Sequence, residues 1–295
     1  HEGRVRPVLQ QPAHEIGQAA VNSLRRFGVK TDFILRGGDR LGIYFLETGA
    51  AQRPSKVIYD RANAAITQVK PGEFDWEHIF EGAKWFHFTG ITPALGDNVA
   101  EVTLEALKVA KKKGVKVSAD LNYRKKLWSP EKANQVMSKL MEYVDVSIGN
   151  EEDAEKVFGI KAAASDVTTG QLNEEGYREV AKQLADRFGL EKVAITLRES
   201  LSASDNNWSA LLYDGQNFYR SRTYKIHIVD RVGGGDSFAG GLIYSLLNGK
   251  SSAEALEFAV AASCLKHSIF GDFNLVSVAE VETLAQGDAS GRVQR

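Results

Sequence analysis

The chain has 295 residues, 43% of them hydrophobic and 25% charged, which is the balance of an ordinary globular protein and fits one α/β domain over residues 1–295. Its 37 Lys and Arg residues nearly balance 38 Asp and Glu residues, so no overall positive field would attract a nucleic acid. No stretch approaches the roughly 20 apolar residues that span a bilayer, and the lone Cys264 can form neither an internal disulfide nor a thiolate metal cage. We therefore expect a cytoplasmic protein without nucleic-acid or membrane partners.

The first predicted element is a helix that follows an irregular start. Residues 1–13 show no regular pattern and lack the apolar core of a secretory signal, so we expect a loop there. From Ile16 to Phe27 apolar residues recur at helical spacing, and Gly28 is a typical residue at the end of a helix. A strand at 32–36 is predicted to follow the helix.

The next segment has the pattern of a β-hairpin. Two predicted strands, 42–47 and 56–60, flank a polar loop that contains Gly49 and Pro54. This hairpin interrupts an otherwise regular alternation of strands and helices. Residues 41–61 are therefore expected to form a small appendage to the main fold.

Strands and helices alternate along the rest of the chain. The predicted strands are 85–88, 115–120, 144–148 and 193–197, with a second hairpin of 208–213 and 218–222. The predicted helices are 97–113, 130–142, 174–188, 237–247 and 253–267. This order predicts an α/β fold with a mostly parallel sheet flanked by helices. Ligands bind beyond the carboxyl ends of such strands, which here are followed by Asp120 to Asn122, Gly149 to Asn150 and the segment from Asp230.

The most informative segment is the glycine-rich turn at residues 230–241, with the sequence DRVGGGDSFAGG. Helical periodicity continues from Phe238, so the glycines stand at a helix N-terminus, where free amides and the helix dipole favour an anion. The three glycines at 233–235 let the backbone approach a phosphate closely. We expect the dipole to keep Asp236 ionised, ready to accept a proton from an attacking hydroxyl.

Other interpretations of this turn are weaker, with one exception. The spacing lacks the third glycine of a dinucleotide fingerprint, where Phe238 stands, and it lacks the Lys of a P-loop. His14-Glu15 has no second His at the spacing of a helical zinc protease site. Asp236 could, however, simply cap the helix while the glycines form a turn. On the residues alone, a phosphate-binding catalytic turn and a plain helix cap both stay open.

The segment at 232–241 resembles the C-terminal signature of the ribokinase (pfkB) family of carbohydrate kinases. Supporting segments are VIYDR at 57–61, SADLNYR at 118–124, SIGNEED at 147–153 and GDFN at 271–274. The resemblance extends over residues 15–285. Within the family, the sequence is most similar to the branch that phosphorylates 2-keto-3-deoxygluconate. It implies a ribokinase-like fold with a small β-strand lid at 41–61, and ATP and Mg²⁺ as cofactors. Exposed strand edges on such a lid also favour a homo-oligomer.

The resemblance also implies roles for residues of the turn and the lid. Asp236 matches the catalytic base, and the amides of Gly233, Gly234 and Gly235 match the anion hole. The positions that match substrate contacts, together with Asp236, are Tyr44, Tyr59, Arg61, Asn122 and Arg124. Two arginines suit a sugar that bears a carboxylate, because a guanidinium binds a carboxylate through two parallel hydrogen bonds. The alternatives are lid packing for the tyrosines and surface ion pairing for the arginines.

A second group of positions matches contacts to the nucleotide and the metal. Asn150 and Asp153 match an Asn-x-x-Glu element that organises Mg²⁺-bound water and phosphate, with Asp in place of Glu; helix capping by Asn150 is the alternative. Thr196 and Arg198 match the strand end that borders the nucleotide, which Gly233 and Gly235 would also contact. Ser268 and Asn274 are expected near the adenine or in plain loops.

The function implied by the resemblance is ATP-dependent phosphorylation of a sugar acid, 2-keto-3-deoxygluconate to its 6-phosphate. One alternative is a kinase of a neutral sugar of the fructose or ribose type, and the other is an inactive sugar- or nucleotide-binding protein. Family members carry a strand, further lid strands and a Gly-Gly turn ahead of the part that matches Ile16. This sequence does not show them, so we expect a central strand and part of the lid to be missing.

Overall fold

The computed structural model describes residues 5–150, 152–161 and 174–288. Within them a seven-stranded sheet has the order β10-β9-β8-β7-β6-β5, with β11 also paired to β9. The strands are β5 (Trp85–Thr89), β6 (Lys116–Asp120), β7 (Val146–Asn150), β8 (Lys192–Ser200), β9 (Asp205–Tyr213), β10 (Phe218–Arg220) and β11 (Tyr224–His227). Neighbours from β5 to β8 pair parallel, and β9 pairs antiparallel with β8, β10 and β11. Only β9 runs against the other strands, so the mostly parallel sheet is confirmed.

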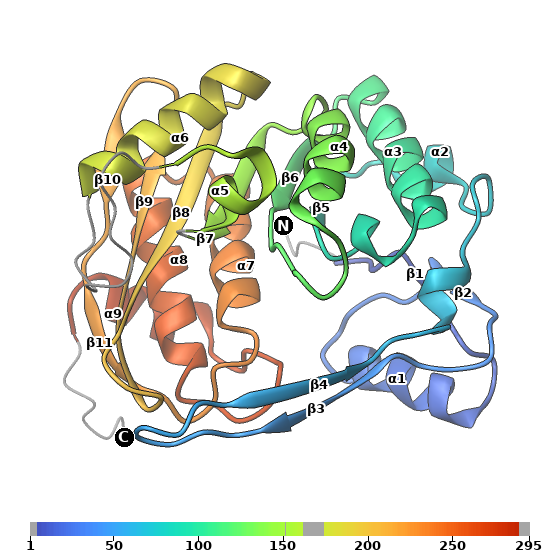
Figure 1. The fold of residues 1–295 in the computed structure, drawn as a ribbon, viewed down its shortest axis with the longest axis horizontal. Helices are drawn as coiled ribbons and strands as arrows, with labels where there is room; N and C mark the ends of the chain where they lie inside the picture. The colour runs from blue at the N-terminus through green and yellow to red at the C-terminus, as the bar shows by residue number, and fades with distance from the viewer. Residues whose placement is uncertain (1–4, 151, 162–173, 289–295) are drawn as a thin grey trace.

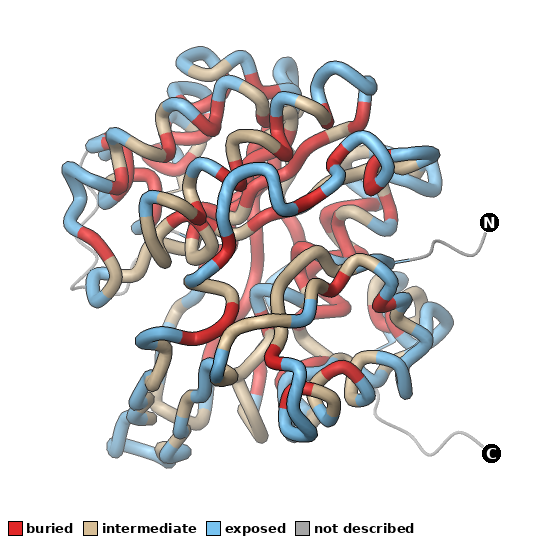
Figure 2. The backbone as a smooth tube through the Cα atoms, turned by 90° about the vertical axis from the view of Figure 1, so that its right-hand side faces the viewer, coloured by how far each residue is buried: buried red, intermediate tan, exposed pale blue. Residues whose placement is uncertain are grey.

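Helices cover both faces of the sheet (Figure 1). One face carries α2 (Trp76–Ile79), α3 (Asp97–Lys112), α4 (Pro130–Met141), α5 (Asp153–Phe158) and α6 (Glu174–Phe188). The other face carries α7 (Gly234–Leu247) and α8 (Ser252–Lys266). Helix α9 (Val278–Ala285) packs on α8. Along β8, Val193 and Ile195 face the first layer and Ala194 faces the second, as strand alternation requires. Buried residues accordingly follow the strands in the middle of the molecule (Figure 2). No helix of the described residues is long and apolar enough to cross a membrane.

Local sequence signals set the helix ends. Helix α4 begins after Ser129, whose hydroxyl accepts the amide of Lys132, and it carries Pro130 at its first position. Helix α8 begins with a capping box between Ser251 and Glu254. These local signals fix where each helix begins.

The start of the chain corrects one expectation. Residues 9–11 form β1 (Leu9–Gln11), which pairs parallel with β2 (Ile34–Arg36), and α1 (Glu15–Arg25) connects the two strands. A strand of three residues has no periodicity to detect, and only its pairing with β2 defines it. The predicted helix from residue 16 and the strand within 32–36 are confirmed.

The predicted hairpin forms a two-stranded sheet of its own, with β3 (Ile43–Glu47) paired antiparallel with β4 (Lys56–Asp60). It extends below the central sheet in Figure 1, and two short helical turns follow it, η1 (Ala65–Gln68) and η2 (Pro93–Leu95). In its register Tyr44 pairs with Tyr59 and Phe45 with Ile58. The side chains of Phe45 and Ile58 are 59% and 55% exposed, so the outer face of the hairpin is apolar and uncovered.

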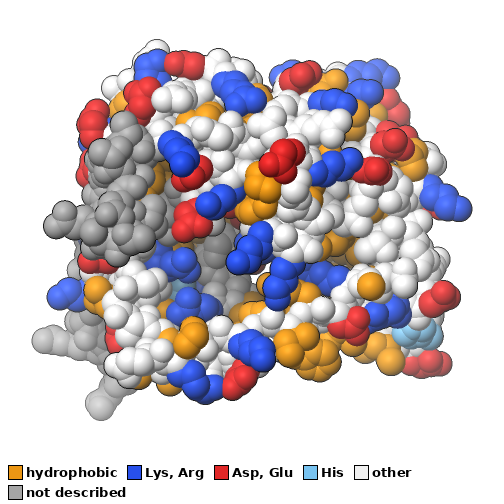
Figure 3. All heavy atoms as spheres, in the orientation of Figure 1, with side chains coloured by type: hydrophobic (Ala, Val, Ile, Leu, Met, Phe, Trp, Pro, Cys, Tyr) orange, Lys and Arg blue, Asp and Glu red, His pale blue; other side chains and the backbone are white. Residues whose placement is uncertain are grey.

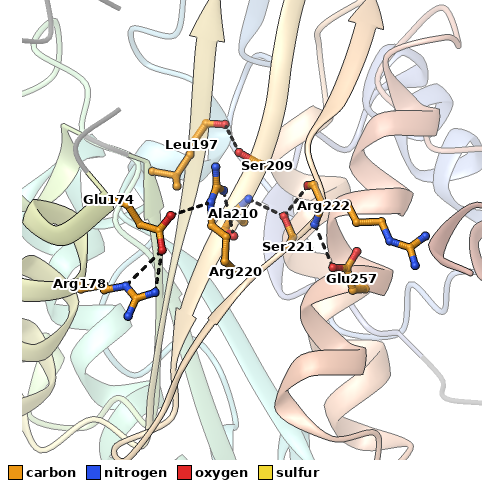
Figure 4. Close-up of polar contacts among 9 residues, drawn as sticks. All are labelled: Glu174, Arg178, Leu197, Ser209, Ala210, Arg220, Ser221, Arg222 and Glu257. Atoms are coloured by element: carbon orange, nitrogen blue, oxygen red, sulfur yellow. Dashed lines mark hydrogen bonds and ion pairs between the residues drawn. The ribbon is translucent and has the colours of Figure 1, made fainter. Parts of the chain in front are cut away.

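The edge of the sheet formed by β10 is held by a polar network that joins both helix layers (Figure 4). Arg220 of β10 lies 3.6 Å from Glu174 of α6, which also pairs with Arg178. On the other side the amide of Arg222 donates to Glu257 of α8 at 2.9 Å. This edge is therefore fixed from both faces.

Candidate active site

A cleft of about 590 Å³ lies between the hairpin and the carboxyl ends of the parallel strands. Its walls include side chains from β3 and β4, from the ends of β5 to β8 and from the start of α7. Lys and Arg side chains gather around a hollow beside the hairpin in Figure 3. A smaller cavity of about 250 Å³ adjoins the cleft at Tyr44, Arg61 and Ile91, but it does not reach the glycine turn. We therefore locate the chemistry in the larger cleft.

The glycine turn has the shape of an anion-binding helix start. Gly233 has φ +79° and precedes α7, and no side chain caps this N-terminus among the described residues. A Cβ on Gly233 would come within 2.4 Å of the Asp272 carbonyl oxygen, and one on Gly234 would come within 2.7 Å of the His267 ring. A Cβ on Gly235 would meet no atom within 4 Å. The backbone is thus tightly packed behind the turn and open at Gly235, where a phosphate could approach.

Asp236 stands in the first turn of α7 and lines this cleft. Its side chain is open to the water of the cleft, yet the surrounding protein reduces its hydration and raises its pKa. The Asp236 backbone amide and Arg124 oppose this pKa shift, and the charge of Asp272 adds to it. Burial therefore has a larger effect on this pKa than the backbone hydrogen bond, and the expectation that Asp236 is ionised stays a prediction. A raised pKa suits a general base, which works best when its pKa lies near the working pH.

Three further carboxylates line the same cleft, those of Asp120, Asp153 and Asp272. Burial is the main reason that the pKa of Asp120 rises to about 8, and the charges of Asp153 and Asp236 raise it further. Sequence analysis identified Asp120 only as a strand end and gave it no role. Asp120 could have been predicted as a site residue because it is the last residue of β6, beside the segments from β7 and α7.

Arginines supply the opposite charge. Arg61 stacks over the Tyr59 ring at 4.2 Å from the guanidinium carbon to the ring centre. Burial raises the pKa values of Asp120, Asp153 and Asp236, and the charge of Arg124 opposes this rise at all three carboxylates. The predicted Arg61 and Arg124 therefore face one cleft rather than separate surface positions.

The hairpin also reaches the loop that follows α8. The Tyr44 hydroxyl donates to the Asp272 carboxylate at 2.6 Å, and the Tyr44 and Tyr59 ring centres are 6.3 Å apart. On the sheet side Asn122 has φ +40° and its amide donates to the Thr89 hydroxyl at 3.0 Å. A non-glycine residue in this conformation is strained, and such strain is common at functional sites.

Comparison with known proteins now identifies the family. The model of the pfkB family of carbohydrate kinases matches residues 12–272. The chain belongs to this family. It is 34% identical to the 2-dehydro-3-deoxygalactonokinase of Haloferax volcanii, covering 95% of this chain and 81% of the relative. The crystal structure of 2-dehydro-3-deoxygluconokinase from Thermotoga maritima is 54% identical with a TM-score of 0.92, covering 96% of this chain and 84% of that one.

More distant solved structures share the fold. A ribokinase II structure from Escherichia coli, in complex with ATP and Mg²⁺, has a TM-score of 0.78 and 19% identity, and it covers 97% of this chain and 84% of that one. The ribokinase-like fold class is therefore confirmed. The chain is an ATP-using carbohydrate kinase by family.

The kinase brings most of the predicted site residues to one place. The cleft is lined by Tyr44, Tyr59, Arg61, Asn122, Arg124, Asn150, Asp153, Thr196, Arg198, Gly233, Gly234, Gly235 and Asp236. Ser268 and Asn274 do not line it: the Ser268 hydroxyl donates to Leu265 O at 2.6 Å, and the Asn274 amide donates to Ala262 O at 3.0 Å. Their expected contact with adenine stays a prediction without support from their placement.

The predicted metal-organising pair is occupied by local hydrogen bonds in this kinase. Asn150 Oδ1 accepts the amides of Glu152 and Asp153 at 2.8 and 3.1 Å, just before α5, whose N-cap residue is Glu152. Both Asp153 oxygens accept backbone amides, from Tyr123 at 3.0 Å and from Asn150 at 2.9 Å. Each carboxylate oxygen keeps a further lone pair, so a contact through water fits this donor set. No cluster of three or more His, Cys, Asp or Glu residues that could hold a metal occurs in the described part of the chain.

The structure adds residues that sequence analysis did not assign. Asp272, Arg231, Trp208 and His267 line the cleft of the kinase together with Thr89. Arg231 donates to Ala203 O at 2.9 Å, in the turn between β8 and β9. Asp272 could have been found from the sequence, because it lies in the GDFN segment at 271–274. Trp208 and His267 could not, because their sequence patterns equally predict ordinary core residues.

Proposed function

We propose that this kinase phosphorylates a hydroxyl of a sugar acid with ATP, converting 2-keto-3-deoxygluconate, also named 2-dehydro-3-deoxygluconate, to its 6-phosphate. The observation that carries the proposal is the presence of Arg61 and Arg124 in the same cleft as Asp236 and the open glycine turn. A carboxylate on the sugar would be held by the guanidinium groups while a hydroxyl faces the base. The named kinases reported above support this substrate class.

Each residue of the chain has a defined task in this proposal. Asp236 accepts the proton of the attacking hydroxyl, and the accessible amide of Gly235 stabilises charge on the transferred phosphoryl group. The amide of Gly234 already donates to Arg231 O at 3.3 Å, so it contributes less to the anion hole than sequence analysis expected. The hairpin excludes water by covering the sugar, through Tyr44 and Tyr59.

ATP and Mg²⁺ fit the remaining residues of the cleft. When bound, Mg²⁺ supplies neutralisation of the phosphate charge. Asn150 and Asp153 would hold it through water, and Thr196 and Arg198 would border the nucleotide. The Thr196 hydroxyl donates to Gly149 O at 3.3 Å, which joins the ends of β7 and β8 on this wall.

The decisive experiment compares substrates on the purified protein. We expect ADP release with 2-keto-3-deoxygluconate at a kcat/KM at least 10 times that with fructose or ribose. The C4 epimer, 2-keto-3-deoxygalactonate, is tested alongside because one of the relatives is named for it. Equal or better turnover of fructose would reject the sugar-acid proposal, and absence of any ADP release would favour a binding protein.

The cellular and quaternary aspects belong to the same proposal. We infer that residues 1–295 act as one cytoplasmic ribokinase-like unit with 41–61 as its lid. The outer face of the hairpin carries apolar Phe45 and Ile58, with Lys56 towards one end and Asp60 towards the other. A two-fold axis through this face would bring Lys56 of one copy near Asp60 of another, so we propose a homodimer through the lid. Light scattering after size exclusion tests this assembly: the unaltered protein should be a dimer and Phe45→Ser a monomer.

A further inference from the structure

Lys266, the last residue of α8, is fully enclosed by protein. Its exposed fraction is 0%, which is rare for lysine because burying an ammonium group is unfavourable unless other groups compensate. The proposed steps of phosphoryl transfer do not use this residue, and it does not line the cleft. Its position is nevertheless directly behind the reacting groups.

The Lys266 side chain lies against the glycine turn. A Cβ on Gly233 would stand 3.3 Å from Lys266 Cε, on the same side as the Asp272 carbonyl oxygen. The Lys266 ammonium donates to Ile269 O at 2.9 Å. One side chain therefore touches both the turn that begins α7 and the loop that carries Asp272.

Two carboxylates offset part of the cost of burying this charge. The charges of Asp230 and Asp272 favour the ammonium form of Lys266, although burial lowers its pKa. The Asp230 carboxylate in turn accepts the amides of Val232 and Gly271, both at 3.0 Å. The Asp230 carboxylate thus binds both the residues before the glycine turn and the loop that carries Asp272. Its negative charge also acts on the Lys266 ammonium beneath the cleft.

We propose that Lys266 is a positioning residue that serves as a fixed internal cation, holding the glycine turn and the 269–272 loop in the arrangement that receives the phosphoryl group. The inference rests on the proposed phosphoryl transfer. Because an ammonium group occupies this place, a free monovalent cation is not needed there. Lys266 lies on the packed side of the turn, so its positive charge acts across the turn on a phosphoryl group at the open side.

Two variants separate the charge from the volume of the side chain. Lys266→Met keeps most of the volume without the charge, and Lys266→Ala leaves a space that a small cation can enter. We expect both to lower kcat by about 10- to 100-fold, less than the loss of a direct oxyanion donor, with the KM for the sugar acid changed by less than about threefold. Lys250→Met, near the start of α8 and paired with Glu282 at 3.0 Å, is the control and should keep wild-type kcat.

Cation rescue distinguishes positioning by charge from a structural role alone. Assays in a buffer of tetramethylammonium salts are repeated with ammonium, methylammonium or potassium chloride at equal ionic strength. We expect ammonium or methylammonium to restore kcat of Lys266→Ala at least fivefold, to leave Lys266→Met unrestored because methionine fills the space, and to leave the unaltered protein unchanged. Circular dichroism and thermal unfolding check that each variant is folded.

Three outcomes would overturn the inference while leaving the proposed function in place. Wild-type kcat in both Lys266 variants would show that the charge is not needed, and a loss that no cation restores would assign Lys266 a structural role only. Stimulation of the unaltered protein by potassium would show that a free cation is required, and this measurement decides the question even where a variant fails to fold. Absence of turnover by the unaltered protein with every sugar acid would instead reject the proposed function, and the inference with it.

Discussion

The two walls of the cleft are held in different ways. On the wall of α7 and α8, the glycine turn packs against Asp272 and His267, and the Ser263 hydroxyl donates to Gly234 O at 2.7 Å. On the hairpin wall, β3 and β4 pair with each other and with no further strand of the described residues. Contacts of the hairpin with the main body include the Tyr44 hydrogen bond to Asp272 and, at the tip, the donation from Ala203 N to Ala51 O at 2.8 Å.

This difference matches the chemistry assigned to each wall. Transition-state stabilisation requires groups that are already in place, so the base and the anion hole belong on the closely packed wall. Substrate entry requires a wall that can move. A hydrogen bond between neutral groups contributes only about 0.5–1.5 kcal/mol, and one to a charged group such as the Asp272 carboxylate about 1.5–3 kcal/mol. Changes to the glycine wall should therefore lower kcat, and changes to the hairpin should raise KM.

The largest expected effect is the loss of the base. Asp236→Asn should lower kcat by about 10²–10⁴-fold, because an amide cannot accept the hydroxyl proton in the same way. The KM for ATP should change little, and steady-state ADP release measures both constants. Asp97→Asn is the control, since Asp97 also stands in the first turn of a helix, α3, and does not line the cleft. Retention of a tenth of the wild-type kcat by Asp236→Asn would contradict the assignment.

A second test breaks the packing behind the turn. Gly233→Ala should lower kcat by at least tenfold and also reduce the melting temperature, because the new Cβ would meet the Asp272 carbonyl oxygen at 2.4 Å. Gly249→Ala is a matched control: Gly249 has φ +73°, and its Cβ would meet no atom within 4 Å. Both variants share a conformational strain of about 1–2 kcal/mol. Equal unfolding temperatures and equal kcat for the two would show that the contact is unimportant.

The hairpin wall is tested through Arg61. Arg61→Met should raise the KM for a sugar acid by about 10- to 100-fold, since a charge-assisted hydrogen bond contributes about 1.5–3 kcal/mol. The kcat at saturating sugar should stay within a few fold. Arg53→Met is the control, because Arg53 lies near the hairpin tip and pairs with Glu47. A fall in kcat with KM unchanged would contradict a role in substrate binding and would show that Arg61 acts in catalysis.

The smallest expected effect is a shift in pH dependence. The base must be deprotonated, so kcat/KM should fall as the pH drops through the pKa of Asp236, which lies above its ordinary value of 3.8. The charge of Asp272 raises this pKa, so Asp272→Asn should move the acidic limb of the profile to lower pH. Profiles at constant ionic strength measure the shift, with Asp39→Asn as the control. A shift to higher pH would contradict the electrostatic coupling.

Much of the fold was predictable because its signals are local. The helix at 174–188 has the bounds predicted from its apolar spacing, and the hairpin strands differ from prediction by one residue at most. Strand β11 and helix α5 were missed because four to six residues carry too little periodicity. Helix α9 was missed although Ser277 and Glu280 form a capping box, a signal that was present in the sequence.

By itself, the sequence determined the alternation of strands and helices, the helix start at the glycine turn and the family to which these segments belong. Only the tertiary structure decided which side chains share the cleft and which charge lies beneath it. Asp120, Asp272 and Lys266 are informative because of neighbours distant in sequence and because of burial. Burial and long-range charge depend on how the layers pack, and no local spacing records them.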